Sequence, residues 1–126
     1  SSDLLASAQA LRAARNWSGA ASAYGELIER FPRSREARAA TISLATLRLD
    51  HLGDPRGALG LFDRYLAAGA AGALAQEASY GRCRALRILG RTAAERAALE
   101  RFVAAYPGAI EAPGARARLA EIGASR

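Results

Sequence analysis

Apolar side chains recur three and four residues apart along most of the chain. Ala20, Tyr24, Leu27 and Ile28 are an example, and this spacing places them on one side of a helix. Residues that stop helices, mainly glycine and proline, separate the apolar stretches. The pattern predicts helices at about residues 4–15, 18–31, 35–52, 55–68, 74–89, 92–105 and 112–123. We therefore expect an all-α fold.

The predicted helix boundaries coincide with residues that favour helix ends. Ser18 is the expected N-cap of the second helix, because its hydroxyl can accept a hydrogen bond from a free backbone N–H group. Asp54 is expected to cap the fourth helix, with Pro55 at the first helical position. Gly90 is expected to end the fifth helix, and Thr92 lies near the start of the sixth. The chain is predicted to reverse direction at these points.

An aromatic-proline pair occurs twice, each time after a predicted helix. Phe31-Pro32 follows the second helix, and Tyr106-Pro107 follows the sixth, 75 residues further along. Proline removes a backbone donor and restricts the residue before it, so each pair is expected to end a helix. The two junctions indicate a repeated unit. We predict one domain, residues 1–126, with helical hairpins at about residues 3–34, 35–73 and 74–108.

A second signature supports the repeat. The 75-residue shift places Ala10-Leu11-Arg12 on Ala85-Leu86-Arg87, and Thr46-Leu47-Arg48 occurs between them. In this middle copy we place two extra residues in the turn between the helices. Gly69-Ala70 replaces the aromatic-proline stop, so the glycine- and alanine-rich stretch around it is expected to be a turn between hairpins.

The last predicted helix, about residues 112–123, has no partner helix after it. Ala115, Leu119 and Ile122 share one side of this helix, and the other side is polar. A stack of hairpins needs a terminal element with a polar outer face. We therefore expect this helix to cap the stack.

Composition agrees with close-packed helices. Of the 126 residues, 51% are apolar but only 6% are aromatic, and alanine is abundant. No stretch of 18 residues is free of charge, so we expect no membrane span. Because the sequence contains no methionine, we expect a processed product or a piece of a longer chain, with any signal peptide or lipid anchor outside it. A cytoplasmic and a periplasmic location are equally compatible with this sequence.

The chain is basic, and all 18 basic residues are arginine against 12 acidic residues, which gives a net charge of +6. Such a charge favours acidic partners of any kind. Nucleic acid is not favoured among them, because the sequence lacks a basic block and aromatic residues interleaved with arginines. The charge alone therefore does not identify the class of partner.

Residues with catalytic or metal-binding chemistry are few. His51, the only histidine, lies at a helix end beside a turn, where a solvent-facing or C-capping role is expected. Cys83, the only cysteine, is expected to be a buried, unreactive thiol. Trp17 is expected to pack its turn onto the neighbouring helix, the alternative being an anchor for a partner. No metal-ligand spacing or phosphate-binding loop is present, so we predict no cofactor and no enzymatic activity.

The spacing Ala-x3-aromatic-x2-apolar-x4-Pro, repeated every 36 to 39 residues or so, resembles the tetratricopeptide repeat. The first hairpin contains it as Ala20, Tyr24, Leu27 and Pro32. The third hairpin departs from it at Glu95, where the family has a small residue. The residues of this hairpin that match are Leu99, Phe102 and Pro107. In its first helix the family usually has a glycine, and here that position is Ala8 in the first hairpin and Cys83 in the third.

The resemblance implies a short right-handed superhelix of paired helices. The aromatic-proline junctions are also similar to those of bacterial envelope members of the family, such as the Tol-Pal cell-division coordinator and the outer-membrane assembly lipoproteins. This similarity implies a periplasmic adaptor as one context. The family's clamp for chaperone C-termini needs lysine and asparagine where this sequence has Leu5 and Gln9, so we do not expect chaperone-tail binding.

By the same resemblance, one face of the first helix of each hairpin lines a concave groove that holds peptides. Arg12, Arg48 and Arg87 occupy the same position in the three copies and are expected to form a ladder of guanidinium groups. The alternative is that they are ordinary solvated residues paired with nearby acids such as Glu77. The full predicted wall is Leu5, Gln9, Arg12, Arg38, Thr41, Ala45, Arg48, Glu77, Tyr80, Arg84 and Arg87.

Taken as a whole, the sequence predicts a non-catalytic adaptor that binds an acidic segment of a partner protein in this groove. The alternative is a module that assembles larger structures by self-association through an exposed apolar flank, which would make it a homo-oligomer.

Overall fold

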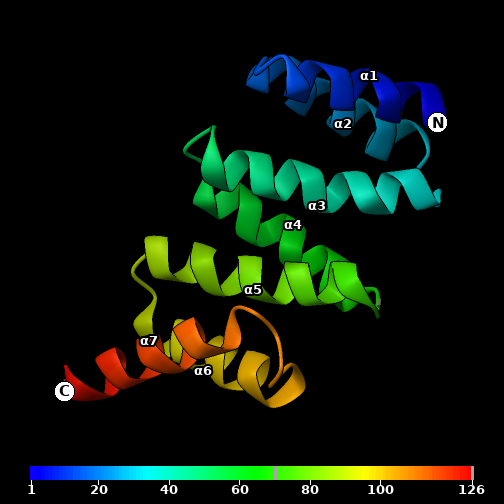
Figure 1. Cartoon of the computed structure of the whole chain (residues 1–126). Helices are drawn as coiled ribbons and strands as arrows, with labels where there is room; N and C mark the ends of the chain where they lie inside the picture. Colours follow the sequence, from blue (N-terminus) through cyan, green and yellow to red (C-terminus); the bar gives the residue numbers. More distant parts are fainter. Residues whose placement is uncertain (70, 126) are drawn as a thin grey trace.

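The computed structural model describes residues 1–69 and 71–125, and all regular secondary structure within them is α-helical (Figure 1). The all-α prediction is confirmed. Each predicted helix has bounds within two residues of those observed. The helices are α1 (Ser2–Ala13), α2 (Trp17–Arg30), α3 (Arg35–Asp50), α4 (Pro55–Ala67), α5 (Ala73–Ile88), α6 (Thr92–Ala105) and α7 (Ala112–Ala124).

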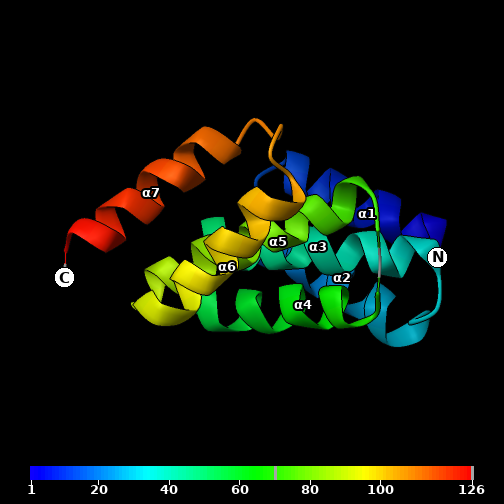
Figure 2. The same ribbon diagram turned by 90° about the horizontal axis from the view of Figure 1, so that it is seen from below.

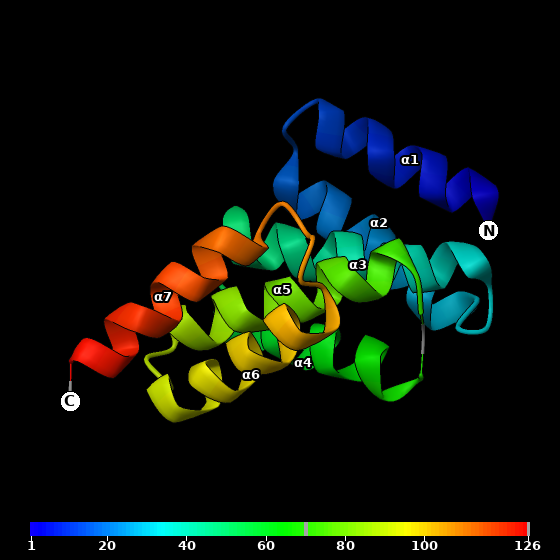
Figure 3. The ribbon, with the colours of Figure 1, turned by 60° about the horizontal axis from the view of Figure 1, so that its bottom comes forward.

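Successive helices pair as antiparallel hairpins, α1 with α2, α3 with α4 and α5 with α6. The hairpins stack along the chain, so that α2 also packs on α3 and α4 on α5. The stack has two layers: α1, α3, α5 and α7 form one, and α2, α4 and α6 form the other (Figures 1 and 2). We call the outer surface of the first layer the odd-helix face. Figure 3 shows α7 at the end of this layer, beyond α5 and α6.

Large side chains from α2, α4 and α6 fill the space between the layers. Tyr24, Phe62 and Phe102, one from each of these helices, are each 1% exposed. Burial of side chains of this size stabilises a fold by about 2–3 kcal/mol each. At the opposing positions the sequence supplies small residues, and Ala8 and Ala20 are completely buried where α1 crosses α2. The pairing of large with small residues allows the helices to approach closely.

The glycine at position 81 is an example of this close packing. It lies in the middle of α5, where it is buried against the ring of Phe62 from α4. A β-carbon added at Gly81 would lie 2.6 Å from Cε1 and 2.7 Å from Cε2 of that ring. No real β-carbon has contacts this short, so the α4–α5 interface requires glycine at this position.

The predicted helix caps are confirmed in part. Asp54 caps α4 by accepting a hydrogen bond from the backbone N–H of Gly57 at 2.9 Å, and Pro55 is the first helical residue. The cap of α2, however, is Asn16, whose Oδ1 accepts from the N–H of Gly19 at 3.0 Å. Ser18 was predicted for this role but lies inside the first turn, because the helix begins one residue earlier than the sequence suggested.

The turns within the first and third hairpins have the same backbone shape. Gly90 follows α5 with φ of 71°, and Arg15 lies 75 residues before it with φ of 61°. A left-handed residue at the same place in both hairpins supports the repeat that the sequence indicated. Ala70, which we placed in the turn between the second and third hairpins, lies outside the described residues. Across the described ranges, no helix is both long enough and apolar enough to cross a membrane.

Candidate functional site

The odd-helix face contains two hollows, each formed between neighbouring hairpins. The first, of about 420 Å³, lies between α1 and α3 and includes Gln9 and Arg12 of the predicted wall. The second, of about 330 Å³, lies between α3 and α5 and includes Glu77, Tyr80 and Arg84. Leu5 is half-buried against the core at the start of α1. The predicted residues of α1 and α5 therefore lie on the odd-helix face.

The predicted residues of α3 lie elsewhere. Ala45 is completely buried, and Thr41 is buried with its hydroxyl donating to the carbonyl oxygen of Ala37 at 2.9 Å. Arg38 and Arg48 lie beside α2 and α4, where each lines a hollow that includes Ile28. The ladder of Arg12, Arg48 and Arg87 is thus corrected, because its middle member points away from the odd-helix face.

The physical reason is a register shift on α3. We had placed the extra residues of the middle hairpin in its turn, but the turn of residues 51–54 is only one residue longer than the turns at 14–16 and 89–91. The other extra residues extend α3 at its C-terminal end. The burial pattern consequently aligns Ile42 with Cys83 of α5, whereas the alignment of the Leu-Arg pairs placed Leu44 there. The two alignments differ by two residues, and two residues turn a helix face by about 200°.

Two residues that the sequence did not indicate therefore face the two hollows from α3, and a third, Asp50, binds a residue of the second hollow. Ser43 lines the hollow with Gln9 and Arg12, and Thr46 lines the hollow with Tyr80 and Arg84. Asp50 accepts a hydrogen bond from Arg84 at 2.6 Å. A sequence signal for them did exist, since aligning the small and apolar residues at 37, 40, 42, 44 and 45 with those at 78, 81, 83, 85 and 86, instead of the Leu-Arg pairs, gives the observed register.

The wall of the α1/α3 hollow includes a stacked ring pair. The rings of Trp17 and His51 are 3.7 Å apart and inclined by only 7°. Trp17 was predicted to pack its turn onto the neighbouring helix, and this is confirmed, since His51 is the C-cap residue of α3. His51 itself is exposed at the helix end, as predicted. The stack joins the turn of the first hairpin to the turn of the second.

Carboxylates neutralise most arginines on or near this face. Arg84 pairs with Asp50 at 2.6 Å, and Arg87 lies 3.9 Å from Glu121 of α7. Within the described residues, Arg12 has no carboxylate within 4.0 Å. The odd-helix face is therefore of mixed charge, and Arg12 is the guanidinium most available to an incoming acid.

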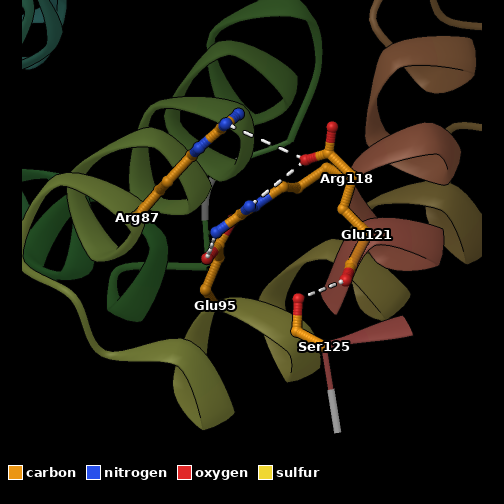
Figure 4. A network of polar contacts seen from close by, with 5 residues as sticks. All are labelled: Arg87, Glu95, Arg118, Glu121 and Ser125. Atoms are coloured by element: carbon orange, nitrogen blue, oxygen red, sulfur yellow. Dashed lines mark hydrogen bonds and ion pairs between the residues drawn. The ribbon is translucent and has the colours of Figure 1, made fainter. Parts of the chain in front are cut away.

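A buried ion pair fixes α7 to the end of the stack (Figure 4). The side chain of Glu95 in α6 is 2% exposed, and both its oxygens accept hydrogen bonds from Arg118 of α7, at 2.7 and 2.9 Å. Arg118 also donates to Glu121 at 3.2 Å. The hydrogen bonds to Glu95 raise the pKa of Arg118 further above its usual range. Glu95, which replaces the expected small residue, thus binds the terminal helix.

The predicted capping role of α7 agrees with its packing. Ala115 and Ile122 are buried, and Leu119 packs half-buried on the same side. The polar residues of the opposite side are exposed. The helix therefore contributes both an apolar contact and the ion pair with Glu95.

The single thiol has no feature of a reactive cysteine. Cys83 is 2% exposed, and desolvation by burial raises its pKa to about 11. Because the thiolate is the reactive form, a buried thiol with a raised pKa is inert near neutral pH. The prediction of a buried, unreactive residue is confirmed. Within residues 1–69 and 71–125, no group of three or more His, Cys, Asp or Glu side chains is placed to hold a metal ion.

This pKa gives a testable pH dependence. The unfolded chain releases the Cys83 proton near pH 9, whereas the folded chain retains it up to about pH 11. Stability therefore falls as the pH rises through this window, by about 1 kcal/mol at pH 10. We expect the Cys83→Ala variant to lose less stability than the parent chain between pH 8 and pH 10 in urea titrations. Parallel curves for the two proteins would contradict the assignment.

The first hairpin has the strongest likeness to a known family. Ala20, Tyr24 and Leu27 are all buried in it, and Ala8 is buried where α1 crosses α2. Residues 4–34 match the tetratricopeptide repeat. The match covers α1, α2 and the junction that follows them, and the later hairpins share its two-helix arrangement. No curated protein matches the chain.

Proposed function

We propose that this chain is a non-catalytic protein-interaction module that holds a segment of a partner protein on its odd-helix face. Repeats of the kind matched by residues 4–34 generally mediate contacts between proteins. The observation on which the proposal depends is the α1/α3 hollow, because it combines a polar floor with an aromatic wall at the junction of two hairpins. The junctions at Phe31-Pro32 and Tyr106-Pro107 are similar to those of bacterial envelope proteins, so a periplasmic context and a cytoplasmic one are equal alternatives for this module.

The chemistry of this hollow suits an acidic side chain. Arg12 offers the two parallel donors that match a carboxylate, and Gln9 and Ser43 add neutral donors beside it. The stacked rings of Trp17 and His51 provide an apolar surface for the neighbouring part of the segment. An extended segment with one Asp or Glu among apolar residues would satisfy all of these groups.

Selection from a displayed library of random peptides, followed by titration of the enriched peptides, tests the proposal. We expect enrichment of Asp or Glu, and a change in the fluorescence of Trp17, the only tryptophan, when such a peptide binds. The Arg12→Glu variant is expected to weaken binding about tenfold or more, because a favourable charge pair becomes a repulsive one. The matched control is Arg101→Glu, an exposed arginine on α6 in the opposite layer. If Arg12→Glu retains full affinity, the odd-helix face is not the site.

A second candidate function is self-association. Three large apolar side chains of the described residues are exposed: Ile110, before α7, is 91% exposed, Ile88, at the end of α5, is 58% exposed, and Leu52, in the turn after α3, is 37% exposed. Exposed apolar groups of this size favour contacts with other proteins or with a second copy. Light scattering over a range of concentrations decides, because a dimer that Ile110→Ser dissociates would support this function. A concentration-independent monomer would exclude it.

A further inference from the structure

The layer opposite the odd-helix face contains a groove between α2 and α4. Both helices pack on α3, which lies between them in the other layer (Figures 1 and 2). Two hollows, of about 430 and 160 Å³, follow one another along this groove and share Ile28, Pro32 and Arg64. The shared residues make the two hollows one continuous groove, which we call the α2/α4 groove.

Each helix contributes a stripe of residues to the α2/α4 groove. On α4, Leu61 and Tyr65 lie four residues apart, and both are less than 10% exposed. Ile28 contributes from α2, and Leu44 of α3 lies at the floor. Gly25 on α2 also lines the groove, and the space beside its Cα is open, with nothing within 4 Å of where its β-carbon would be. The floor is therefore apolar.

Arginines border this apolar floor. Arg38, Arg48 and Arg64 line the groove, and Glu29 is the acidic residue among its lining. Arg48 lies 4.0 Å from Asp54, a loose contact, and its side chain is 37% exposed. Arg38 and Arg64 are exposed and, in the described part of the chain, have no carboxylate within 4.0 Å. Three arginines against one lining acid give the groove a net positive charge, and Arg38 and Arg64 carry the part that has no acidic partner.

The equivalent space between α4 and α6 provides an internal comparison. Two arginines, Arg82 and Arg101, line this space as well. There, however, Arg82 of α5 donates to Asp63 of α4 at 2.6 Å. Among the described residues, Arg38 and Arg64 of the α2/α4 groove have no such partner, so their guanidinium groups remain available to a ligand.

We propose that the α2/α4 groove is a second docking site, which takes an acidic segment of a partner protein with apolar side chains among its carboxylates. The apolar side chains would contact Leu44 and Leu61, and the carboxylates would pair with Arg38 and Arg64 through parallel hydrogen bonds. The groove follows residues 37–48 of α3, about 16 Å, which is room for about eleven helical or five extended residues.

This site is independent of the odd-helix face. Arg64 lies on α4, in the layer opposite α1 and Arg12, and Arg38 and Arg48 lie on the side of α3 that borders α2 and α4. A chain with both sites could therefore hold two segments at once. The sequence reading had grouped Arg38, Thr41 and Arg48 with Arg12 in one wall. Their assignment to a separate groove follows from the register of α3.

Fluorescence polarisation with a synthetic probe tests the inference. The probe is a labelled peptide of about twelve residues, with leucines three and four residues apart and glutamate elsewhere, so that apolar and acidic side chains both reach the groove. We expect saturable binding by the parent chain and a loss of about tenfold or more in affinity for the double variant Arg38→Glu/Arg64→Glu. Arg101→Glu, in the neighbouring α4/α6 space, is the control for a charge reversal outside the groove and should retain binding.

Two further measurements make the outcome specific. The same peptide with lysine in place of glutamate should not bind, and Arg12→Glu should bind the acidic peptide as the parent chain does. Circular dichroism would show that each variant is still folded. The inference is overturned if the acidic peptide does not bind, if the double variant retains its affinity, or if Arg101→Glu weakens binding as much. Loss of binding only in Arg12→Glu would assign the peptide to the odd-helix face.

Discussion

Replacing Arg118 by alanine is expected to lower the free energy of unfolding by about 3–5 kcal/mol. The reason is that Glu95, with a side chain only 2% exposed, would lose both its hydrogen bonds and remain as an unpaired buried carboxylate. This would be a large part of the total stability of a small domain. Urea unfolding, followed by the helical signal in circular dichroism, measures the loss.

Two further variants isolate the cause. Arg116→Ala removes an arginine from the same helix, but one that is exposed and donates only to the carbonyl oxygen of Pro107, so we expect a change of about 0.5 kcal/mol or less. The double variant Glu95→Ala/Arg118→Ala should be more stable than Arg118→Ala alone, because no charge is left buried. If Arg118→Ala costs no more than Arg116→Ala, the pair does not hold α7 in place.

Replacing Gly81 by alanine is expected to destabilise the fold by about 1–3 kcal/mol, although alanine is the better helix former. The added methyl group would lie 2.6 Å from a ring carbon of Phe62, so either the ring or α5 must move. The same unfolding measurement gives the magnitude. We expect the helical content to be unchanged, because the conflict lies between α4 and α5.

The control for this prediction is another glycine in a helix. Gly60 in α4 is exposed, and nothing lies within 4 Å of where its β-carbon would be. Gly60→Ala should therefore stabilise the chain by about 0.5–1 kcal/mol through helix propensity alone. Opposite signs at the two positions would confirm that packing against Phe62 decides the effect. Stabilisation by both substitutions would show that the α4–α5 interface adjusts without cost.

The helices and several of their ends could be predicted because local chemistry determines them. Asp54 and Pro55 determine the start of α4 through a cap and a fixed φ, and both act within a few residues of the chain. The spacing of Ala20, Tyr24 and Leu27 likewise places them on the buried side of α2 without knowledge of any partner helix. These features give the hairpins and the all-α fold.

The candidate sites could be predicted only in part, because they depend on register and on contacts distant in sequence. Packing decides whether the extra residues of the middle hairpin lengthen α3 or its turn. It makes Ile42, rather than Leu44, the residue of α3 that is equivalent to Ala8 in the first hairpin. The acidic residues that pair with the arginines could not be predicted from the sequence either. Asp50 and Arg84 are 34 residues apart in sequence, and no local pattern joins them.

The ion pair between Asp50 and Arg84 also affects what the α3/α5 hollow can bind. A carboxylate that reaches Arg84 finds a guanidinium already occupied by Asp50 at 2.6 Å, so it gains little unless it displaces that acid. A weakly held anion would be rejected, and a ligand that succeeds in the exchange would break this one link between α3 and α5, while the packing of α4 on α5 still joins the two hairpins. Occupancy of this hollow and formation of the Asp50–Arg84 pair are therefore thermodynamically linked, and each weakens the other to the same extent.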